Sequence, residues 1–142
     1  MNQALFSSSS DEWYTPQKLF DYLDMIFDFT LDPCANGINP LKQNIKEFTI
    51  DDDGLIQDWS NHVVFCNPPY SQIKKWVAKC YHEYLKGTKI CLLIPVRTDT
   101  SYFHDYIYNK ENIKIDFIRG RLKFSNCKNS APFPSMLVYF NL

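Results

Sequence analysis

Four consecutive residues in the middle of the sequence, Asn67-Pro68-Pro69-Tyr70, bring together groups that can bind a planar amine. They follow Val63–Cys66, a continuous apolar run that is typical of a strand buried on both faces of a sheet. The two prolines have no backbone N–H and hold φ at about −65°, so the strand should end there in a stiff loop. Because ligands bind outside the carboxyl ends of strands in open α/β sheets, this loop is the first candidate site.

The chemistry that these groups favour is recognition of an exocyclic amine. The carboxamide oxygen of Asn67 and the carbonyl of Pro68 are neighbouring acceptors, and an amine has two hydrogens that need partners. The ring of Tyr70 offers a flat face, on which a flipped base would gain stacking of about 1–3 kcal/mol. Such a site keeps the amine lone pair available to attack a bound electrophile. The alternative is a proline-rich turn closed by a packed tyrosine, and a short motif alone does not decide between the two.

Length and composition indicate one folded domain. The 142 residues, 45% of them hydrophobic and 16% aromatic, are enough for a substantial core. We predict a flexible arm over residues 1–10, which end in four serines, and a single domain over residues 11–142. No apolar run approaches the roughly 18 residues of a membrane span, and the start of the chain lacks the pattern of a signal peptide. These features predict a cytoplasmic protein with no membrane partner.

Cysteine usage points to a reducing compartment. The chain has 5 cysteines, an odd number, and no C-x-x-C pair. This pattern favours buried free thiols over disulfides or a zinc site. We therefore predict no metal site.

The charge is distributed unevenly between the two parts of the chain. Residues 1–59 carry 11 Asp or Glu and 3 Lys or Arg, giving −8, whereas residues 60–142 carry 5 and 12, giving +7. A positive part that begins beside the candidate loop suits a phosphate backbone. The alternative is solvated surface on both parts, because folding can interleave them.

The elements that must position the loop are predicted from periodicity and turn signals. Apolar residues at helical spacing predict a helix over residues 16–27, which Thr15 can cap with Pro16 at the first position. Residues 29–31 and 45–50 have the character of short strands.

The rest of the chain continues the alternation of helices and strands. We predict helices over residues 73–84 and 102–107, the first ending near Gly87, and strands over residues 89–94, 113–118 and 135–140. This order favours an α/β fold in three layers with a mostly parallel sheet.

The most basic stretch of the chain is residues 110–128, with six basic and two acidic side chains. Within it, Arg119 and Arg121 flank a glycine in a predicted loop, where guanidinium groups can contact phosphate or a base edge. Arg97 follows the strand over residues 89–94 and should lie at the same sheet edge as Asn67. A surface turn is the alternative for the two loop arginines.

Beyond these inferences, Asn67-Pro68-Pro69-Tyr70 resembles the catalytic motif of amino-group methyltransferases that use S-adenosylmethionine. Similar tetrapeptides occur in enzymes that methylate adenine in DNA, guanine in RNA and glutamine in proteins. A longer set of motifs in fixed order narrows the resemblance to small phage and prophage DNA N6-adenine methyltransferases of the Dam type. It runs from about Trp13 to Phe140 and includes Asp32-Pro33-Cys34-Ala35, Gly54-Leu55, Asp58-Trp59, Leu93-Ile94-Pro95, Gly120-Arg121 and Phe124. The chain departs from most methyltransferases in having one glycine, Gly37, where they carry a Gly-rich turn.

The resemblance implies a three-layer Rossmann-like class I methyltransferase fold with an antiparallel last strand. It implies catalysis by Asn67, Pro68, Pro69 and Tyr70, with S-adenosylmethionine held by Trp13, Thr15, Pro16, Asp32, Pro33, Cys34, Ala35, Asp58 and Trp59. The expected contacts with double-stranded DNA come from Arg97, Arg119, Arg121 and Lys123. Asp58 is expected near the adenine amine of the cofactor, and Asp51, Asp52 and Asp53 are undecided candidates for its ribose.

The implied reaction is methyl transfer to adenine N6 in DNA, which would protect phage DNA from restriction. Methylation of RNA or of a protein glutamine, a non-catalytic binder of cofactor or DNA, and a structural α/β domain are the alternatives. With no separate recognition domain, sequence specificity would come from short loops or from the partner in a homodimer, or would be low.

Overall fold

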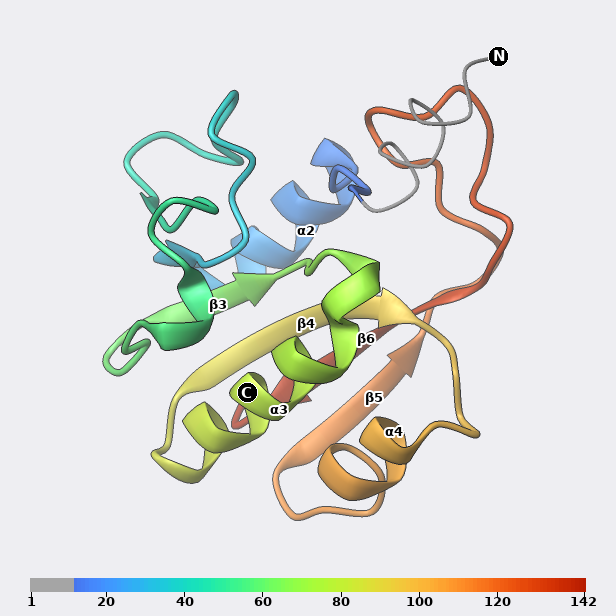
Figure 1. Ribbon diagram of the computed structural model, residues 1–142. Coiled ribbons are helices and arrows are strands. Elements are labelled where there is room, and N and C mark those ends of the chain that lie inside the picture. Colours follow the sequence, from blue (N-terminus) through green and yellow to red (C-terminus); the bar gives the residue numbers. More distant parts are fainter. Residues whose placement is uncertain (1–11) are drawn as a thin grey trace.

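The computed structural model of the protein describes residues 12–142 (Figure 1). The predicted flexible arm, residues 1–10, lies outside the described residues. In chain order the elements, with η marking a 3-10 turn, are α2 (Gln17–Phe27), β1 (Leu31–Asp32), β2 (Lys46–Glu47), η1 (Gly54–Ile56), β3 (Val63–Cys66), η2 (Tyr70–Gln72), α3 (Ile73–Leu85), β4 (Lys89–Pro95), α4 (Ser101–Tyr106), β5 (Ile113–Phe117) and β6 (Ser135–Phe140). Within residues 12–142, no helix has the length and apolar character needed to cross a membrane.

The six strands form one sheet in the order β2-β1-β3-β4-β6-β5. Neighbours among β2, β1, β3 and β4 pair in parallel, and β6 runs antiparallel to both β4 and β5. Five strands therefore point one way and the last strand points the other, which confirms the predicted antiparallel final strand. All five parallel strands end at one edge, and the loop after β3 lies there.

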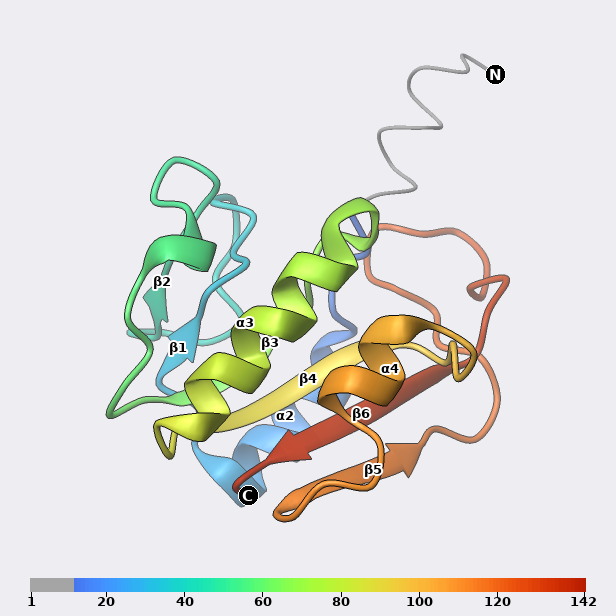
Figure 2. The same cartoon turned by 60° about the horizontal axis from the view of Figure 1, so that its bottom comes forward.

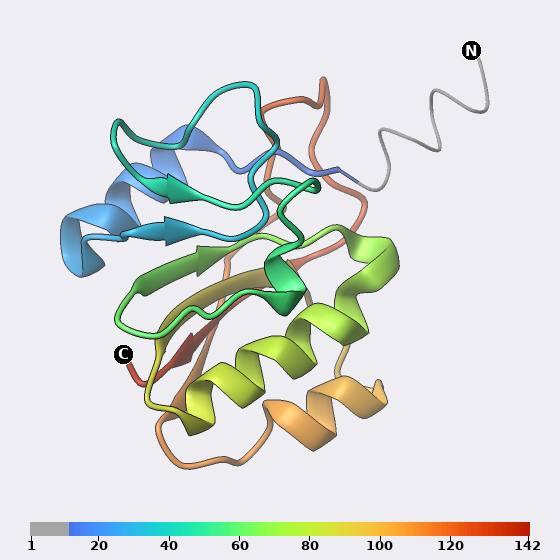
Figure 3. The ribbon, with the colours of Figure 1, turned by 60° about the vertical axis from the view of Figure 1, so that its left-hand side comes forward.

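Helices cover both faces of this sheet. Helix α2 lies on one face, and α3 and α4 lie on the other (Figures 2 and 3). Each face has its own buried apolar cluster. Phe20 and Leu23 of α2 pack with Phe65, and on the opposite face Trp76 and Val77 of α3 are packed in the other cluster. Because β3 and β4 contribute side chains to both clusters, the central strands are apolar at every position except Lys89.

The predicted boundaries differ from the observed ones mainly in the acidic part of the chain. Strands β1 and β2 are two residues long, shorter than the predicted 29–31 and 45–50. Pairing nonetheless reaches Thr30, whose N–H donates to the carbonyl of Val63 at 2.8 Å. The predicted strand 45–50 ends early because the backbone turns, with the carbonyl of Thr49 accepting from two following N–H groups.

The predicted helix cap at Thr15 is wrong. Helix α2 begins at Gln17, and Pro16 precedes it with extended backbone angles, φ −60° and ψ 124°, and without a side-chain cap. Because Pro16 is extended, Thr15 lies one residue further from the first helical N–H groups than a cap must. Its hydroxyl is used elsewhere, as described below.

Candidate active site

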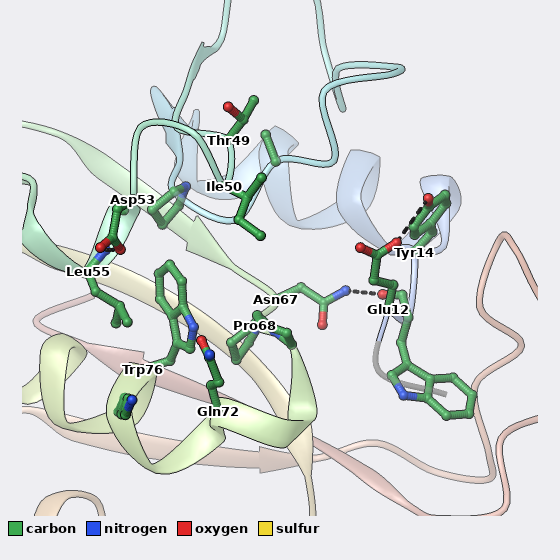
Figure 4. A pocket seen from close by; sticks show the side chains of 16 residues that line it. Glu12, Tyr14, Thr49, Ile50, Asp53, Leu55, Asn67, Pro68, Gln72 and Trp76 are labelled. Atoms are coloured by element: carbon green, nitrogen blue, oxygen red, sulfur yellow. Dashed lines mark hydrogen bonds between the residues drawn. The ribbon is translucent and has the colours of Figure 1, made fainter. Parts of the chain in front are cut away.

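A hollow at the carboxyl edge of the sheet lies beside the loop after β3. It has a volume of about 450 Å³, within the usual range for ligand sites. Four segments supply its lining: the start of the described chain, the loop after β1, the turn before η1 together with η1, and the loop after β3 together with the first turn of α3 (Figure 4). The lining residues are Glu12, Trp13, Tyr14, Pro33, Ala35, Thr49, Ile50, Asp53, Gly54, Leu55, Asn67, Pro68, Pro69, Gln72, Lys75 and Trp76.

A smaller hollow of about 220 Å³ adjoins the first. Its lining residues are Tyr14, Thr15, Gln17, Asp32, Asn36, Asn39, Pro40, Leu41, Asn67 and Ser125. Tyr14 and Asn67 line both hollows. Asn67 therefore lies where the two cavities meet, directly after the last residue of β3.

The carboxamide of Asn67 is held in one orientation. Its Nδ2 donates to the carbonyl of Trp13 at 2.5 Å and to Oγ1 of Thr15 at 3.0 Å. A carbonyl can only accept, so the group that faces Trp13 must be the amide nitrogen. The oxygen Oδ1 is buried and has no hydrogen-bond partner among the described residues. An orphaned buried acceptor costs free energy unless a ligand satisfies it, so Asn67 presents a ready acceptor to the site.

Tyr70 lies next to the cavities without lining either of them. Its ring stacks on Trp13, with centroids 5.8 Å apart and an interplanar angle of 20°. It also forms a T-shaped contact with the ring of Phe133, at an interplanar angle of 72°. Burial raises the pKa of the Tyr70 phenol above its usual value, so the group stays protonated. A base that stacks on the same face of Tyr70 has to displace the Trp13 ring.

Asp32 is the last residue of β1, and its side chain faces the smaller cavity. One carboxylate oxygen accepts from the N–H of Cys34 at 3.1 Å. Burial nevertheless raises the pKa of this carboxyl to about 7, and the nearby charge of Glu47 also raises it. A carboxyl in this state is poised to ionise when a cation enters the cavity.

The loop after Asp32 forms one wall of the larger cavity. Pro33 and Ala35 line it, whereas the thiol of Cys34 turns away and lies 3.5 Å from the sulfur of Cys66. Burial raises the pKa of the Cys34 thiol to about 11, so it remains a neutral packing group. All five cysteines are free thiols. Cys34 is therefore the one member of Asp32–Ala35 whose side chain is directed away from both cavities.

Among the clustered aspartates, the structure places Asp53 at the larger cavity. Its carboxylate also accepts from the N–H of Leu55 at 3.1 Å, which fixes its position. Asp52 is turned back to the N–H of Thr49, and Asp51 is exposed and lines neither cavity.

Asp58 does not reach the cavities, contrary to expectation. Its carboxylate pairs with Lys86 at 2.9 Å and accepts from the N–H of Ser60, and 71% of its side chain is exposed. These hydrogen bonds hold the pKa of Asp58 well below its usual value, and the bond from Lys86 has the largest effect. Trp59 is fully buried and supports the site indirectly, because its Nε1 donates to the carbonyl of Gly54 at 2.9 Å. Pro16 also lines neither cavity.

Sequence reasoning missed the side chains contributed by η2 and the first turn of α3. Lys75 and Trp76 of α3 line the larger cavity, as does Gln72 of η2, and the indole N–H of Trp76 is buried with no partner in the described part of the chain. Trp76 also stacks on Trp59, with centroids 6.2 Å apart. The helical spacing of Trp76 indicates a core position. That pattern contains no signal that the same side chain also borders a cavity.

The four predicted DNA-binding side chains line neither cavity. Arg97 follows β4, and Arg119, Arg121 and Lys123 follow β5, so both segments leave the sheet at the edge where Asn67 lies. All four are exposed. None of them forms an ion pair within residues 12–142, so their charges are available to a partner.

The fold and the cavities define the class: an α/β protein with its candidate site at the carboxyl edge of a mostly parallel sheet. The sequence model of the family described as DNA N-6-adenine-methyltransferase (Dam) matches residues 3–139. The chain belongs to this family, which confirms the resemblance drawn from its motifs. A protein of Haemophilus phage HP1 (strain HP1c1), named DNA N-6-adenine-methyltransferase, is 29% identical over 142 residues, covering 94% of this chain and 80% of the relative.

Proposed function

We propose that this protein transfers a methyl group from S-adenosylmethionine to the N6 amino group of adenine in DNA. The observation that carries the proposal is the orphaned oxygen of Asn67. It is a buried acceptor at the junction of two cavities, and both amide hydrogens are already donated to the protein. An exocyclic amine is a donor that such an acceptor can bind. Family membership selects adenine in DNA among the amines that fit.

The two cavities fit a cofactor with a cationic end and a nucleoside end. Asp32 in the smaller cavity would face the ammonium group, and Asp53 in the larger would accept from ribose hydroxyls. The unpartnered indole N–H of Trp76 offers a donor at the nucleoside end. When bound, S-adenosylmethionine supplies an electrophilic methyl group. We accordingly assign the sheet and its two helical faces to the three-layer class I methyltransferase fold.

In this proposal the residues of the loop act by position and electrostatics. The Asn67 oxygen and the Pro68 carbonyl would accept the two amine hydrogens, which keeps the nitrogen lone pair directed at the methyl group. Pro69 stiffens the loop, and its carbonyl accepts from the N–H of Gln72 at 3.2 Å. A flipped adenine would stack on Tyr70 after the Trp13 ring moves. The exposed cations Arg97, Arg119, Arg121 and Lys123 would bind the phosphates of the duplex.

The first prediction concerns Asn67. In Asn67→Ala, methyl transfer to DNA should fall by about 10²–10³, the usual effect of removing one such electrostatic contact, because the amine loses its acceptor. Cofactor affinity should change little, since the cavities keep their other walls. The measurement is nucleoside mass spectrometry after incubation with labelled cofactor and unmethylated DNA, alongside cofactor binding by calorimetry.

The matched control is Asn129→Ala, an exposed asparagine that should retain full activity. Normal N6-methyladenine production by Asn67→Ala would contradict the assigned chemistry. If the wild-type protein binds cofactor but methylates no DNA, RNA and a protein glutamine become the next substrates, and failure on all three would identify a non-catalytic binder. Protection of DNA from restriction enzymes that N6-methylation blocks tests the proposed role in a phage.

A further inference from the structure

We propose that Thr15, Ser125 and Asn126 are positioning residues that hold the Asn67 carboxamide with its oxygen free for the substrate amine. The inference rests on the proposed function. In this proposal, the loop between β5 and β6 determines the orientation of the Asn67 side chain, which follows the central strand β3. Thr15 was expected only to cap a helix and to line a cofactor site, and neither Ser125 nor Asn126 was among the predicted site residues.

The first step is that Asn67 cannot orient itself. A carboxamide can rotate by half a turn about its last torsion, which exchanges its oxygen and nitrogen. After such a rotation the oxygen would face the carbonyl of Trp13, and two acceptors would be placed together without a hydrogen. The Trp13 carbonyl therefore selects the observed orientation, and the Thr15 hydroxyl stabilises it by accepting the second hydrogen of the same nitrogen.

The second step is that Thr15 has no regular secondary structure to hold it. It precedes α2 in an extended segment, yet only 8% of its surface is exposed. Its carbonyl accepts from the hydroxyl of Ser125 at 2.8 Å. The backbone of the residue whose hydroxyl Asn67 uses is thus held by a residue of a distant loop.

The third step is that the same loop forms hydrogen bonds with residues 12–14, which precede Thr15. The N–H of Ser125 donates to the carbonyl of Tyr14 at 2.8 Å, and Asn126 Oδ1 accepts from the N–H of Tyr14 at 2.9 Å. Nδ2 of Asn126 donates to the carbonyl of Glu12 at 2.7 Å. Four hydrogen bonds from two adjacent residues therefore hold residues 12–15 against the sheet. Figure 1 shows the segment between β5 and β6 beside the start of the described chain.

The fourth step is the location of this loop in the chain. Ser125 and Asn126 follow Arg119, Arg121 and Lys123, the exposed cations assigned to DNA. A duplex that contacts those side chains also contacts the segment that holds Thr15. Binding of DNA and orientation of Asn67 therefore use one continuous piece of the chain.

The test compares Thr15→Val with Thr15→Ser. Valine has the shape of threonine but no acceptor, so kcat for DNA methylation should fall at least tenfold while KM for the cofactor stays within twofold. Serine keeps the hydroxyl and should restore kcat. A rise in KM for the cofactor with unchanged kcat would overturn the proposal, because it would show that Thr15 serves the cofactor alone. Equal defects in the valine and serine variants would also overturn it.

Thr88→Val is the matched control. Thr88 is also buried, and its hydroxyl donates to Glu83 at 3.0 Å, away from either cavity. The Thr88→Val variant should have a lower melting temperature than the wild-type protein. Its kcat should be unchanged at a temperature where both Thr88→Val and Thr15→Val are folded. If Thr15→Val does not fold, Ser125→Ala and Asn126→Ala provide the same comparison, with exposed Ser130→Ala as their control. Full kcat in both loop variants would overturn the role of the loop.

Nuclear magnetic resonance of the Asn67 side-chain amide separates this proposal from the methylation reaction. Both amide protons should be shifted downfield and protected from exchange in the wild-type protein and in Thr15→Ser. One of them should lose both properties in Thr15→Val. That pattern would support the positioning role even if the wild-type protein methylated no DNA, whereas unchanged signals in Thr15→Val would overturn it.

Discussion

The carboxyl of Asp32 shows how one residue can combine binding with sensitivity to pH. Burial raises its pKa from 3.8 to about 7, although the N–H of Cys34 opposes the shift. The neutral form is therefore the stable one below neutral pH when no cation is bound. A cationic ligand favours the charged form, so its binding should release a proton.

We predict that cofactor affinity rises as pH increases toward about 7 and then levels off. The ammonium group attracts the ionised carboxylate, and below pH 7 part of the binding free energy is used to remove the proton from Asp32. Calorimetric titration across pH 5.5–8.5, in buffers of different ionisation enthalpy, measures both the affinity and the proton release. In Asp32→Asn, affinity should be low at every pH.

The control for this prediction is Asp58→Asn, which removes an exposed carboxylate that lines neither cavity. It should leave the affinity and its pH dependence unchanged.

The stability of the protein gives an independent check of the direction in which the pKa of Asp32 is shifted. Between about pH 4 and 7 the unfolded carboxyl has lost its proton while the native one retains it, so stability should fall as pH rises through this window. An Asp32→Asn variant with the wild-type slope would contradict the assignment.

At the scale of elements, the acidic edge of the sheet depends on contacts between loops. Strands β1 and β2 contribute two residues each, too few to fix the long segments that follow them. The loop after β1 and the turn η1 approach closely instead. A Cβ added at Gly54 would lie 2.2 Å from the carbonyl oxygen of Pro33 and 3.0 Å from the Trp76 ring. The absence of a side chain at Gly54 therefore allows one wall of the larger cavity to form.

We predict that Gly54→Ala weakens cofactor binding at least tenfold and destabilises the fold. The carbonyl of Pro33 belongs to the backbone and has to move, so the cost should be about 1–3 kcal/mol, as for overpacked cores. Cofactor titration and urea unfolding measure the two effects. Gly120→Ala is the control for cofactor binding, because a Cβ there meets nothing within 4 Å; its left-handed φ of 75° should cost about 1–2 kcal/mol of stability without changing cofactor affinity. Wild-type cofactor affinity in Gly54→Ala would show that this close approach is unnecessary.

Helix α3 has a polar face on which the lysines differ in their surroundings. Lys74 and Lys75 are exposed, and Lys75 also lines the larger cavity. Lys79 is instead half-buried, with its ammonium 5.2 Å from the centre of the Trp59 ring and paired with Glu83 at 3.0 Å. Periodicity could not predict this, because Trp59 precedes β3 and reaches the helix only through the fold.

At the scale of the whole molecule, the sheet gathers the predicted site at one edge. The loops after β1, β3, β4 and β5 all leave in the same direction, because those strands point the same way. The basic segments after β4 and β5 therefore lie at the same edge as Asn67, and Asp32 at the end of β1 and the aspartates that follow β2 lie there too. One edge thus offers cations for a polyanion and carboxylates for a small cationic ligand.

We predict that the double variant Arg119→Ala/Arg121→Ala weakens DNA binding and flattens its dependence on salt. Each arginine that contacts a phosphate should lower the slope of log K against log salt by about one unit, because fewer counterions are released. Fluorescence anisotropy with a labelled duplex at 50–200 mM salt measures the slope. Cofactor affinity should not change, since neither arginine lines a cavity.

The charge-matched control is Lys89→Ala/Lys114→Ala. Lys89 is the first residue of β4 and Lys114 the second of β5, so both lie toward the opposite edge of the sheet. This double variant should retain the wild-type salt slope. An equal loss of affinity in the two double variants would mean that DNA is attracted by overall charge and not by the predicted surface.

The sequence by itself determined the central strands, the helices that follow them and the position of the amide loop. These features depend on local pattern: apolar runs, helical spacing and prolines act within a few residues. It also contained the family motifs, and the antiparallel last strand was expected from that resemblance alone. The tertiary structure alone decided that Asp53 and not Asp58 borders a cavity, that Trp76 lines it, and that Thr15 and Ser125 stand behind Asn67. Those contacts join residues far apart in the chain, up to 110 positions for Thr15 and Ser125, and no local pattern records which distant groups the folded sheet brings together.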